Sequence, residues 1–168
     1  MKKTKKLLIL SMMLGMALVI YVIESQIPVL FPGIKLGLAN SISLFALLCF
    51  GWKEAIIIMV LRTFLGAVFG GNLFGFLFSL SGGILSNIVM ICLYKYFKDE
   101  ISISWLSVGG AIFHNIGQLL IAAFIIKDFR IYFYLPVLMI SAVITGYFIG
   151  IVVELLRKRF YTILKIAK

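Results

Sequence analysis

Four polar residues lie deep inside apolar stretches of this sequence, where a side chain that binds a ligand stands out. One is Arg62, and the other three form a cluster in a later stretch, His114, Asn115 and Gln118. The spacings of three and four residues within the cluster place these side chains on one side of a helix. A guanidinium, an imidazole and two amides supply donors and acceptors suited to a heterocycle or a phosphate. The pattern predicts a site for a small polar ligand.

The elements that position these residues follow from length and composition. The chain has 168 residues, of which 63% are hydrophobic and 13% charged, and this is typical of integral membrane proteins. A helix crosses the hydrocarbon layer with about 20 apolar residues, so the length allows six crossings and no separate soluble domain. We predict one all-α domain over residues 1–168, with six transmembrane helices in the runs Leu7–Ile23, Leu36–Phe50, Ala55–Phe69, Leu73–Tyr94, Ile101–Ile126 and Ile131–Val153. No small-x-small cleavage site follows the first run, so we expect a retained helix and not a signal peptide.

The basic residues predict the orientation. With both termini in the cytoplasm, twelve of the 16 lysines and arginines face inward, and three face outward: Lys35, Lys127 and Arg130. This asymmetry follows the positive-inside rule. We therefore expect a multi-pass protein of the cell membrane with cytoplasmic termini, and we attribute the net charge of +10 to membrane sidedness and not to nucleic-acid binding.

Arg62 is expected near the middle of the third span, where a buried guanidinium costs several kcal/mol unless it is paired or hydrated. All six acidic residues are expected near the membrane boundaries: Glu24 and Asp128 outside, and Glu54, Asp99, Glu100 and Glu154 inside. Arg62 would then lack an acidic partner at its depth, which favours an anionic or carbonyl-rich ligand. The alternatives are pairing with backbone carbonyls or snorkelling. For the cluster on the fifth span, the alternative is an interhelical hydrogen-bond network.

A proline-rich connection precedes the second span. The segment Glu24–Lys35 is a candidate lid over an outward-facing cavity, and an ordinary surface loop is the alternative. Lys35 and Asn40 would lie at the mouth of that cavity, where Lys35 attracts an anion. The structural alternative is that Lys35 anchors the helix at the membrane boundary and Asn40 caps or bridges helices.

Small residues spaced by four predict where helices approach closely. Examples are Gly66 with Gly70 and Gly146 with Gly150, and a longer row runs along the fourth span: Gly71, Gly75, Ser79, Gly83 and Asn87. Such rows favour tight packing in lipid. Ser11 and Gly15 form a similar pair on the first span, which could face outward and receive the helix of a partner.

Several of these stretches resemble a known family. They are GIKLGLAN at 33–40, RTFLG at 62–66, FSLSGG at 78–83 and HNIGQL at 114–119, and they resemble the membrane family labelled heptaprenyl diphosphate synthase component I, also called the Gx transporter family. That family is in turn similar to the substrate-binding S components of energy-coupling factor (ECF) transporters, small basic proteins with six helices and cytoplasmic ends. S components dock on a coupling subunit through an Ala-x-x-x-Ala pair, whose nearest equivalent here is Ser11 and Gly15. The 35–40 stretch is similar to the Lys-Leu-Asp-Leu-Ser-Asp region of riboflavin-type S components, with Gly37 and Asn40 in place of the acids, so the identity of the ligand does not carry over.

The resemblance implies an S component that captures a flavin, another vitamin-like molecule or an isoprenoid-related molecule. The resemblance also implies that its partners are a transmembrane coupling protein and ATPase subunits. The chain has no phosphate-binding Gly-x-x-x-x-Gly-Lys-Ser/Thr loop, which excludes an ATPase of its own. We expect neither a cofactor nor a metal, since Cys49 and Cys92 are isolated in apolar runs. We also expect no enzyme activity, because prenyl diphosphate synthesis needs Asp-rich clusters for magnesium and Asp99 and Asp128 are the only aspartates. The alternative function is a membrane accessory or scaffold protein for isoprenoid or quinone biosynthesis.

Overall fold

The computed structural model describes residues 3–26, 38, 40–71, 73–97 and 100–166, and this part of the chain is helical without a β-strand. The helices are α1 (Lys3–Gln26), α2 (Asn40–Cys49), α3 (Trp52–Gly70), α4 (Leu73–Tyr96), α5 (Ile103–Ile126), the short 3-10 helix η1 (Phe129–Tyr134) and α6 (Leu135–Ile166). The predicted all-α class is confirmed.

Among the described residues, four helical segments are long and apolar enough to cross a membrane: α1, α4, α5, and η1 continued by α6. They indicate a multi-pass membrane protein. α2 is too short for a full crossing, with ten residues. α3 has 19 residues, of which Lys53, Glu54 and Arg62 are charged.

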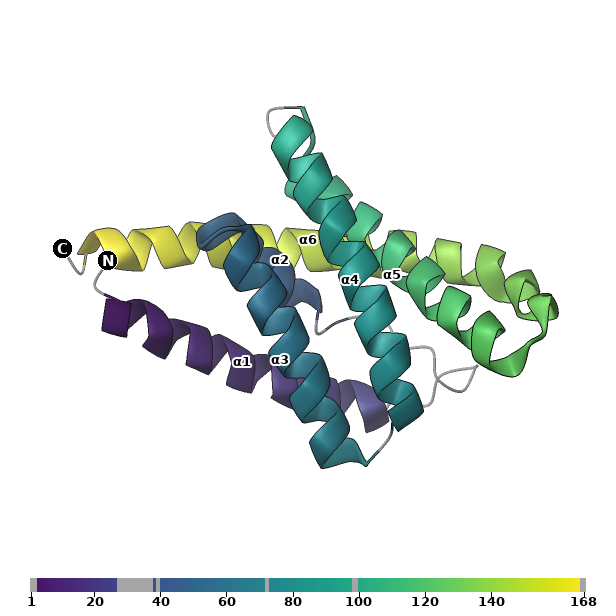
Figure 1. Ribbon diagram of the computed structural model, residues 1–168. Coiled ribbons are helices and arrows are strands. Elements are labelled where there is room, and N and C mark those ends of the chain that lie inside the picture. The colour runs from purple at the N-terminus through teal and green to yellow at the C-terminus, as the bar shows by residue number, and fades with distance from the viewer. Residues whose placement is uncertain (1–2, 27–37, 39, 72, 98–99, 167–168) are drawn as a thin grey trace.

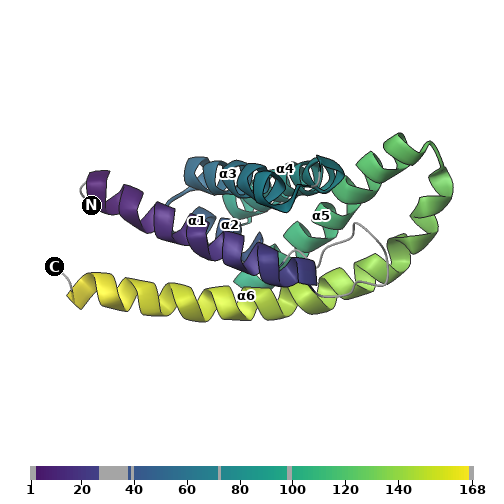
Figure 2. The same cartoon turned by 90° about the horizontal axis from the view of Figure 1, so that it is seen from below.

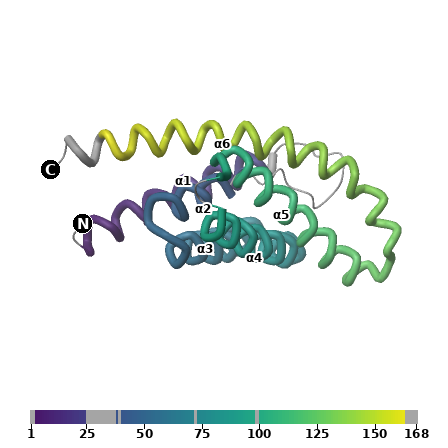
Figure 3. The backbone as a smooth tube through the Cα atoms, turned by 90° about the horizontal axis from the view of Figure 1, so that it is seen from above, coloured from purple at the N-terminus to yellow at the C-terminus, as the bar shows by residue number. Residues whose placement is uncertain are grey.

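α2 is the shortest α-helix and the central one. It contacts all five of the others, and seven of its ten residues are buried. Figures 2 and 3 show α6 along one side of the molecule and the α3–α4 pair along the other, and Figure 1 shows both chain ends at the same end of the bundle. An apolar helix surrounded on all sides by protein has no lipid-facing surface, which explains why α2 shows no polar face.

Two contacts bring the start of α3 to the same end of the bundle as the chain termini. Lys6 on the first turns of α1 forms an ion pair with Glu54 on the first turn of α3. The ring of Phe160, late in α6, packs edge-on against Phe45 and Phe50, with centroids 5.5 and 5.8 Å apart. The α2–α3 turn therefore lies beside the first part of α1 and the last part of α6.

Glycines form the closest helix contacts, as the small-residue pairs predict for α6. A Cβ atom added at Gly150 would lie 2.3 Å from Cα of Ser104, and one at Gly146 would lie 2.8 Å from Cα of Val108. This pair therefore lets the α5 and α6 backbones approach closely. The prediction is wrong for Gly70, where a Cβ would meet no atom within 4 Å.

The sixth span differs from the predicted Ile131–Val153. Its first residues form η1, and α6 itself begins at Leu135, with Pro136 in the first turn, where a missing N–H breaks no hydrogen bond. At the other end α6 continues to residue 166. Strong helix formers extend it there, and Lys158 pairs with Glu154 one turn earlier at 2.8 Å.

Candidate ligand-binding site

Arg62 faces the interior of the bundle. Its buried neighbours on α3 are Ala55, Ile58, Met59, Thr63 and Gly66, a single helical stripe. The side chain is 3% exposed, and its Nη2 donates a hydrogen bond to Oδ1 of Asn40 at 2.9 Å. Burial and this bond are inconsistent with a guanidinium that snorkels to the membrane boundary. Asn40, the first residue of α2, therefore bridges two helices.

The expectation that Arg62 has no acidic residue near it is wrong. Glu24 is 4% exposed, and its carboxylate attracts the guanidinium of Arg62 electrostatically. One turn earlier on α1, the ring of Tyr21 packs against Gly66, where an added Cβ would lie 3.0 Å from the ring. The end of α1 thus lies against α3 and places an acid near the buried arginine, so Arg62 is less available to a ligand than the sequence suggested.

His114 lies at the closest approach of α4 and α5. A Cβ atom added at Gly82 would be 2.7 Å from Nδ1 of His114, and one at Gly117 would be 2.8 Å from Cα of Gly82. Ser81 adds a hydrogen bond from its Oγ to the carbonyl of Gly117 at 2.8 Å. The imidazole therefore lies directly on the α4 backbone and is 4% exposed.

Asn115 faces a different neighbour. Its Nδ2 donates to the carbonyl of Leu138 on α6 at 3.0 Å. His114 thus packs on α4 while the next residue is bonded to α6, so the cluster does not share one side as the spacing predicted. For Asn115 this contact favours the alternative interpretation, an interhelical hydrogen bond.

Gln118 is a buried residue whose amide has no partner on either side. Its side chain is 2% exposed, and neither its amide oxygen nor its amide nitrogen has a hydrogen-bond partner in the described part of the structure. Buried amides in native proteins are almost always paired, and leaving one unpaired costs about 1–3 kcal/mol. A bound molecule that supplies both a donor and an acceptor would remove this cost.

Further unpaired polar atoms lie on α2, α3 and α4. They are Asn40 Nδ2, Ser43 Oγ, Arg62 Nε, Ser86 Oγ and Asn87 Oδ1. Asn40 and Ser86 line a small cavity of about 10 Å³ together with Ser107 on α5. That volume admits about one water molecule, so we assign a bridging water and not a ligand to this cavity.

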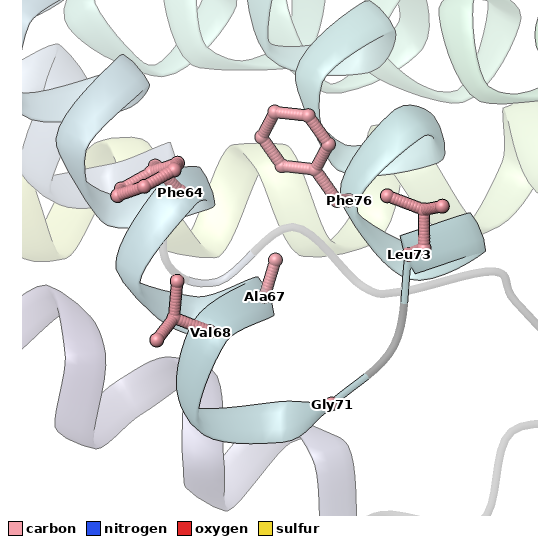
Figure 4. A pocket seen from close by; sticks show the side chains of 6 residues that line it. All are labelled: Phe64, Ala67, Val68, Gly71, Leu73 and Phe76. Atoms are coloured by element: carbon pink, nitrogen blue, oxygen red, sulfur yellow. The ribbon is translucent and has the colours of Figure 1, made fainter.

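A larger groove lies between the end of α3 and the start of α4 (Figure 4). It has a volume of about 330 Å³ and is lined by Phe64, Ala67, Val68, Gly71, Leu73 and Phe76. Every lining side chain is apolar, so the groove suits a hydrocarbon group. The groove was not predicted from the sequence, because residues that line an apolar groove carry the same pattern as residues that face lipid. The burial of Glu24 near Arg62 was not predicted from the sequence either.

Ser11 and Gly15 are both exposed on α1. A Cβ added at Gly15 would meet no atom within 4 Å, and the Ser11 hydroxyl donates to the carbonyl of Leu7 at 3.0 Å. The pair faces away from the bundle, as a docking surface requires, and its use by a partner stays a prediction. Lys35 and residues 27–35 of the candidate lid lie outside the described residues.

Within the described ranges, no three His, Cys, Asp or Glu residues lie close enough together to hold a metal ion. Cys49 and Cys92 are free thiols.

A comparison with protein families gives one match. The model of the family described as heptaprenyl diphosphate synthase component I matches residues 13–156, which is most of the chain and includes α2 to α5 completely. No curated protein and no solved structure matches the chain.

Proposed function

We propose that this chain, which belongs to the heptaprenyl diphosphate synthase component I family, is the substrate-binding membrane subunit of an ECF-type transporter. The observation that carries the proposal is Gln118, a buried amide with two unpaired groups inside an apolar helix. In a scaffold protein an unpaired buried amide would lower stability without serving a function. A binding protein uses it, because the ligand completes the hydrogen bonds.

The ligand class follows from the groups that stay unpaired. Gln118 offers one acceptor and one amide donor. The edge of a heterocycle that carries a carbonyl and an N–H group matches Gln118. We therefore propose a small molecule with such an edge, as in a flavin or another vitamin-like compound. An isoprenoid-related molecule would instead place its hydrocarbon part in the groove beside Phe64 and Phe76.

In the proposed topology the chain crosses the membrane six times, the second time through α2 together with the connection before it, and both ends lie in the cytoplasm. The contacts of Lys6 with Glu54 and of Phe50 with Phe160 support it, because they bring the chain ends and the α2–α3 turn to one side of the bundle. The excess of basic residues expected on that side assigns it to the cytoplasm. Transport energy would come from a coupling protein with ATPase subunits, docked on α1 at Ser11 and Gly15.

Ligand binding can be tested directly. Protein extracted with a mild detergent should release a small molecule that mass spectrometry identifies, and calorimetry with that molecule should show saturable binding. We expect Gln118→Met to weaken affinity about tenfold or more, since one unpaired buried group left on the ligand costs 1–3 kcal/mol. Ser81→Ala, which removes a satisfied hydroxyl on the neighbouring helix, is the control and should keep the affinity. Equal affinity of wild type and Gln118→Met would reject the proposed site.

A second function is favoured by the family description itself, which names a component of heptaprenyl diphosphate synthase. In that case we propose an accessory role without catalysis of chain elongation, because the two aspartates of the chain provide no Asp-rich pair for magnesium. Affinity purification from native membranes separates the two functions. A transporter subunit should bring a coupling protein and ATPases, whereas an accessory component should bring a prenyltransferase.

A further inference from the structure

A second groove lies at the end of the bundle that carries the chain termini. It has a volume of about 540 Å³, within the range of ligand sites in proteins, and lies between the α2–α3 turn and the last turns of α4. Its lining residues are Leu47, Gly51, Trp52, Ile91, Tyr94 and Lys95. Nothing in the proposed transport function uses this groove.

Two kinds of side chain line the groove. Leu47 and Ile91 give it an apolar wall, whereas Trp52 and Tyr94 add amphipathic rings. Trp52 is 53% exposed. Such rings are enriched at the level of the lipid headgroups, where one part of the ring is apolar and another is wet. The groove therefore combines a hydrocarbon-like wall with rings suited to the boundary between membrane and water.

Two lysines give the wet end a positive charge. Lys95 lines the groove, and Nζ of Lys53 lies 5.5 Å from the centre of the Trp52 ring. The acidic residue next to Lys53 in the sequence, Glu54, is engaged by Lys6 on α1. Glu54 thus already has a cationic partner. Lys53 and Lys95 lie over the rings of Trp52 and Tyr96 and form no ion pair in the described part of the structure, so both can meet an anion.

We propose that this groove binds one anionic phospholipid from the leaflet on the side of the chain termini. An acyl chain would lie along Leu47 and Ile91, and the phosphate would lie between Lys53 and Lys95. Basic recesses between helices at a membrane boundary recognise anionic headgroups in this way. A soluble anion does not fit this surface, because the apolar wall would then face water.

Native mass spectrometry with two defined lipids tests the proposal. Purified protein is titrated with phosphatidylglycerol or phosphatidylcholine of the same acyl chains, and the bound lipid is counted. We expect wild type to retain phosphatidylglycerol at least about tenfold more strongly, the combined effect of two lysines at a membrane surface. Lys53→Gln with Lys95→Gln should abolish this preference. Lys5→Gln with Arg159→Gln is the matched control, because it removes the same charge from exposed positions outside the groove and should retain the preference.

A second variant tests the apolar wall without changing the charge. Ile91→Trp fills the groove, so it should lower retention of phosphatidylglycerol by about tenfold while both lysines remain. This variant also covers the case in which the double lysine variant does not fold. Equal retention of the two lipids by wild type would overturn the proposal, as would equal losses in the groove variant and its charge-matched control. Cross-linking of a partner protein at Trp52 in place of a lipid would also overturn it.

Discussion

Arg62 and Asn40 join the middle of α3 to the first residue of α2, with Nη2 of the arginine 2.9 Å from Oδ1 of the amide. This hydrogen bond fixes the start of α2 relative to the buried guanidinium on α3. Glu24 on α1 attracts the same guanidinium, so three helices meet at one cation. Removing the guanidinium leaves Oδ1 of Asn40 buried without this donor.

The buried charges of Arg62 and Glu24 predict that substitutions at the two positions have non-additive effects on the free energy of unfolding. Arg62→Met removes the cation that attracts Glu24, and Glu24→Gln removes the carboxylate that attracts Arg62. Each change should lower the free energy of unfolding by about 1–3 kcal/mol, as expected when a buried polar group loses an interaction. The double variant should be at least about 1 kcal/mol more stable than the sum of the singles predicts. Denaturant unfolding in detergent measures this coupling.

An exposed ion pair provides the control for that cycle. Glu154 and Lys158 on α6 are partly exposed, so Glu154→Gln should change stability by less than about 1 kcal/mol. Strict additivity of the Arg62 and Glu24 variants would show that the two charges do not interact.

The burial of Glu24 shows what counting along the sequence leaves out. Met13, Ala17, Tyr21 and Glu24 are the buried residues of α1, and their spacing of three and four marks one helical stripe. Counting apolar residues along the run places Glu24 at a boundary, because this procedure measures depth and ignores which face a residue occupies. The stripe shows instead that Glu24 points at the bundle, where it meets α3.

Other features needed the tertiary structure. Helical spacing places Gln118 near both His114 and Asn115, but the last two are adjacent and differ in direction by about 100° around the helix. Which neighbour each one meets depends on how α4 and α6 pack on α5. Six apolar runs predicted six helices in the correct order. The short α2 at the centre of the bundle could not be told from a lipid-facing span, because both are apolar on every side.

The close contact between α4 and α5 predicts that adding one methyl group at Gly82 lowers the stability of the protein. Gly82→Ala would place a Cβ 2.7 Å from both Nδ1 and the carbonyl oxygen of His114, and the backbone oxygen cannot move without separating the helices. We expect a loss of about 1–3 kcal/mol, typical of overpacking. Gly15→Ala is the control, because its Cβ meets open space and alanine favours helix by up to about 1 kcal/mol. Equal melting temperatures for the two variants would show that the crossing is loose.

Asn115 should behave as a structural residue. Asn115→Leu removes the hydrogen bond to Leu138 on α6 and should cost about 1 kcal/mol, as interhelical hydrogen bonds do in membranes. Ligand affinity measured by calorimetry should stay within about twofold of wild type. A tenfold loss of affinity at unchanged stability would place Asn115 in the ligand site.

Because Ser11 and Gly15 lie on the outward face of α1, substitutions there should weaken docking of a partner without lowering the stability of the fold. Ser11→Leu with Gly15→Leu enlarges two exposed positions, so the melting temperature of the isolated chain should not fall. Pull-down of the coupling protein should drop about tenfold or more, because the bulky side chains keep the partner helix at a distance. Met12→Leu with Met16→Leu conserves size at neighbouring exposed positions and should preserve the complex. Retained association of the Ser11 and Gly15 variant would reject this docking surface.

The Gln118→Met variant should have opposite effects on the stability of the ligand-free protein and on ligand affinity. If the fold does not use its amide, Gln118→Met removes two unpaired polar groups from an apolar interior while roughly conserving side-chain length. The ligand-free protein should then become more stable, by about 1–3 kcal/mol of recovered desolvation cost. The same variant should lose the stabilisation that the ligand gives to wild type, since bound ligand raises the melting temperature only in proportion to its affinity. Unfolding curves with and without ligand measure both effects on one sample. A variant that is less stable without ligand would show that the amide serves the fold, and the binding site would then have to lie elsewhere.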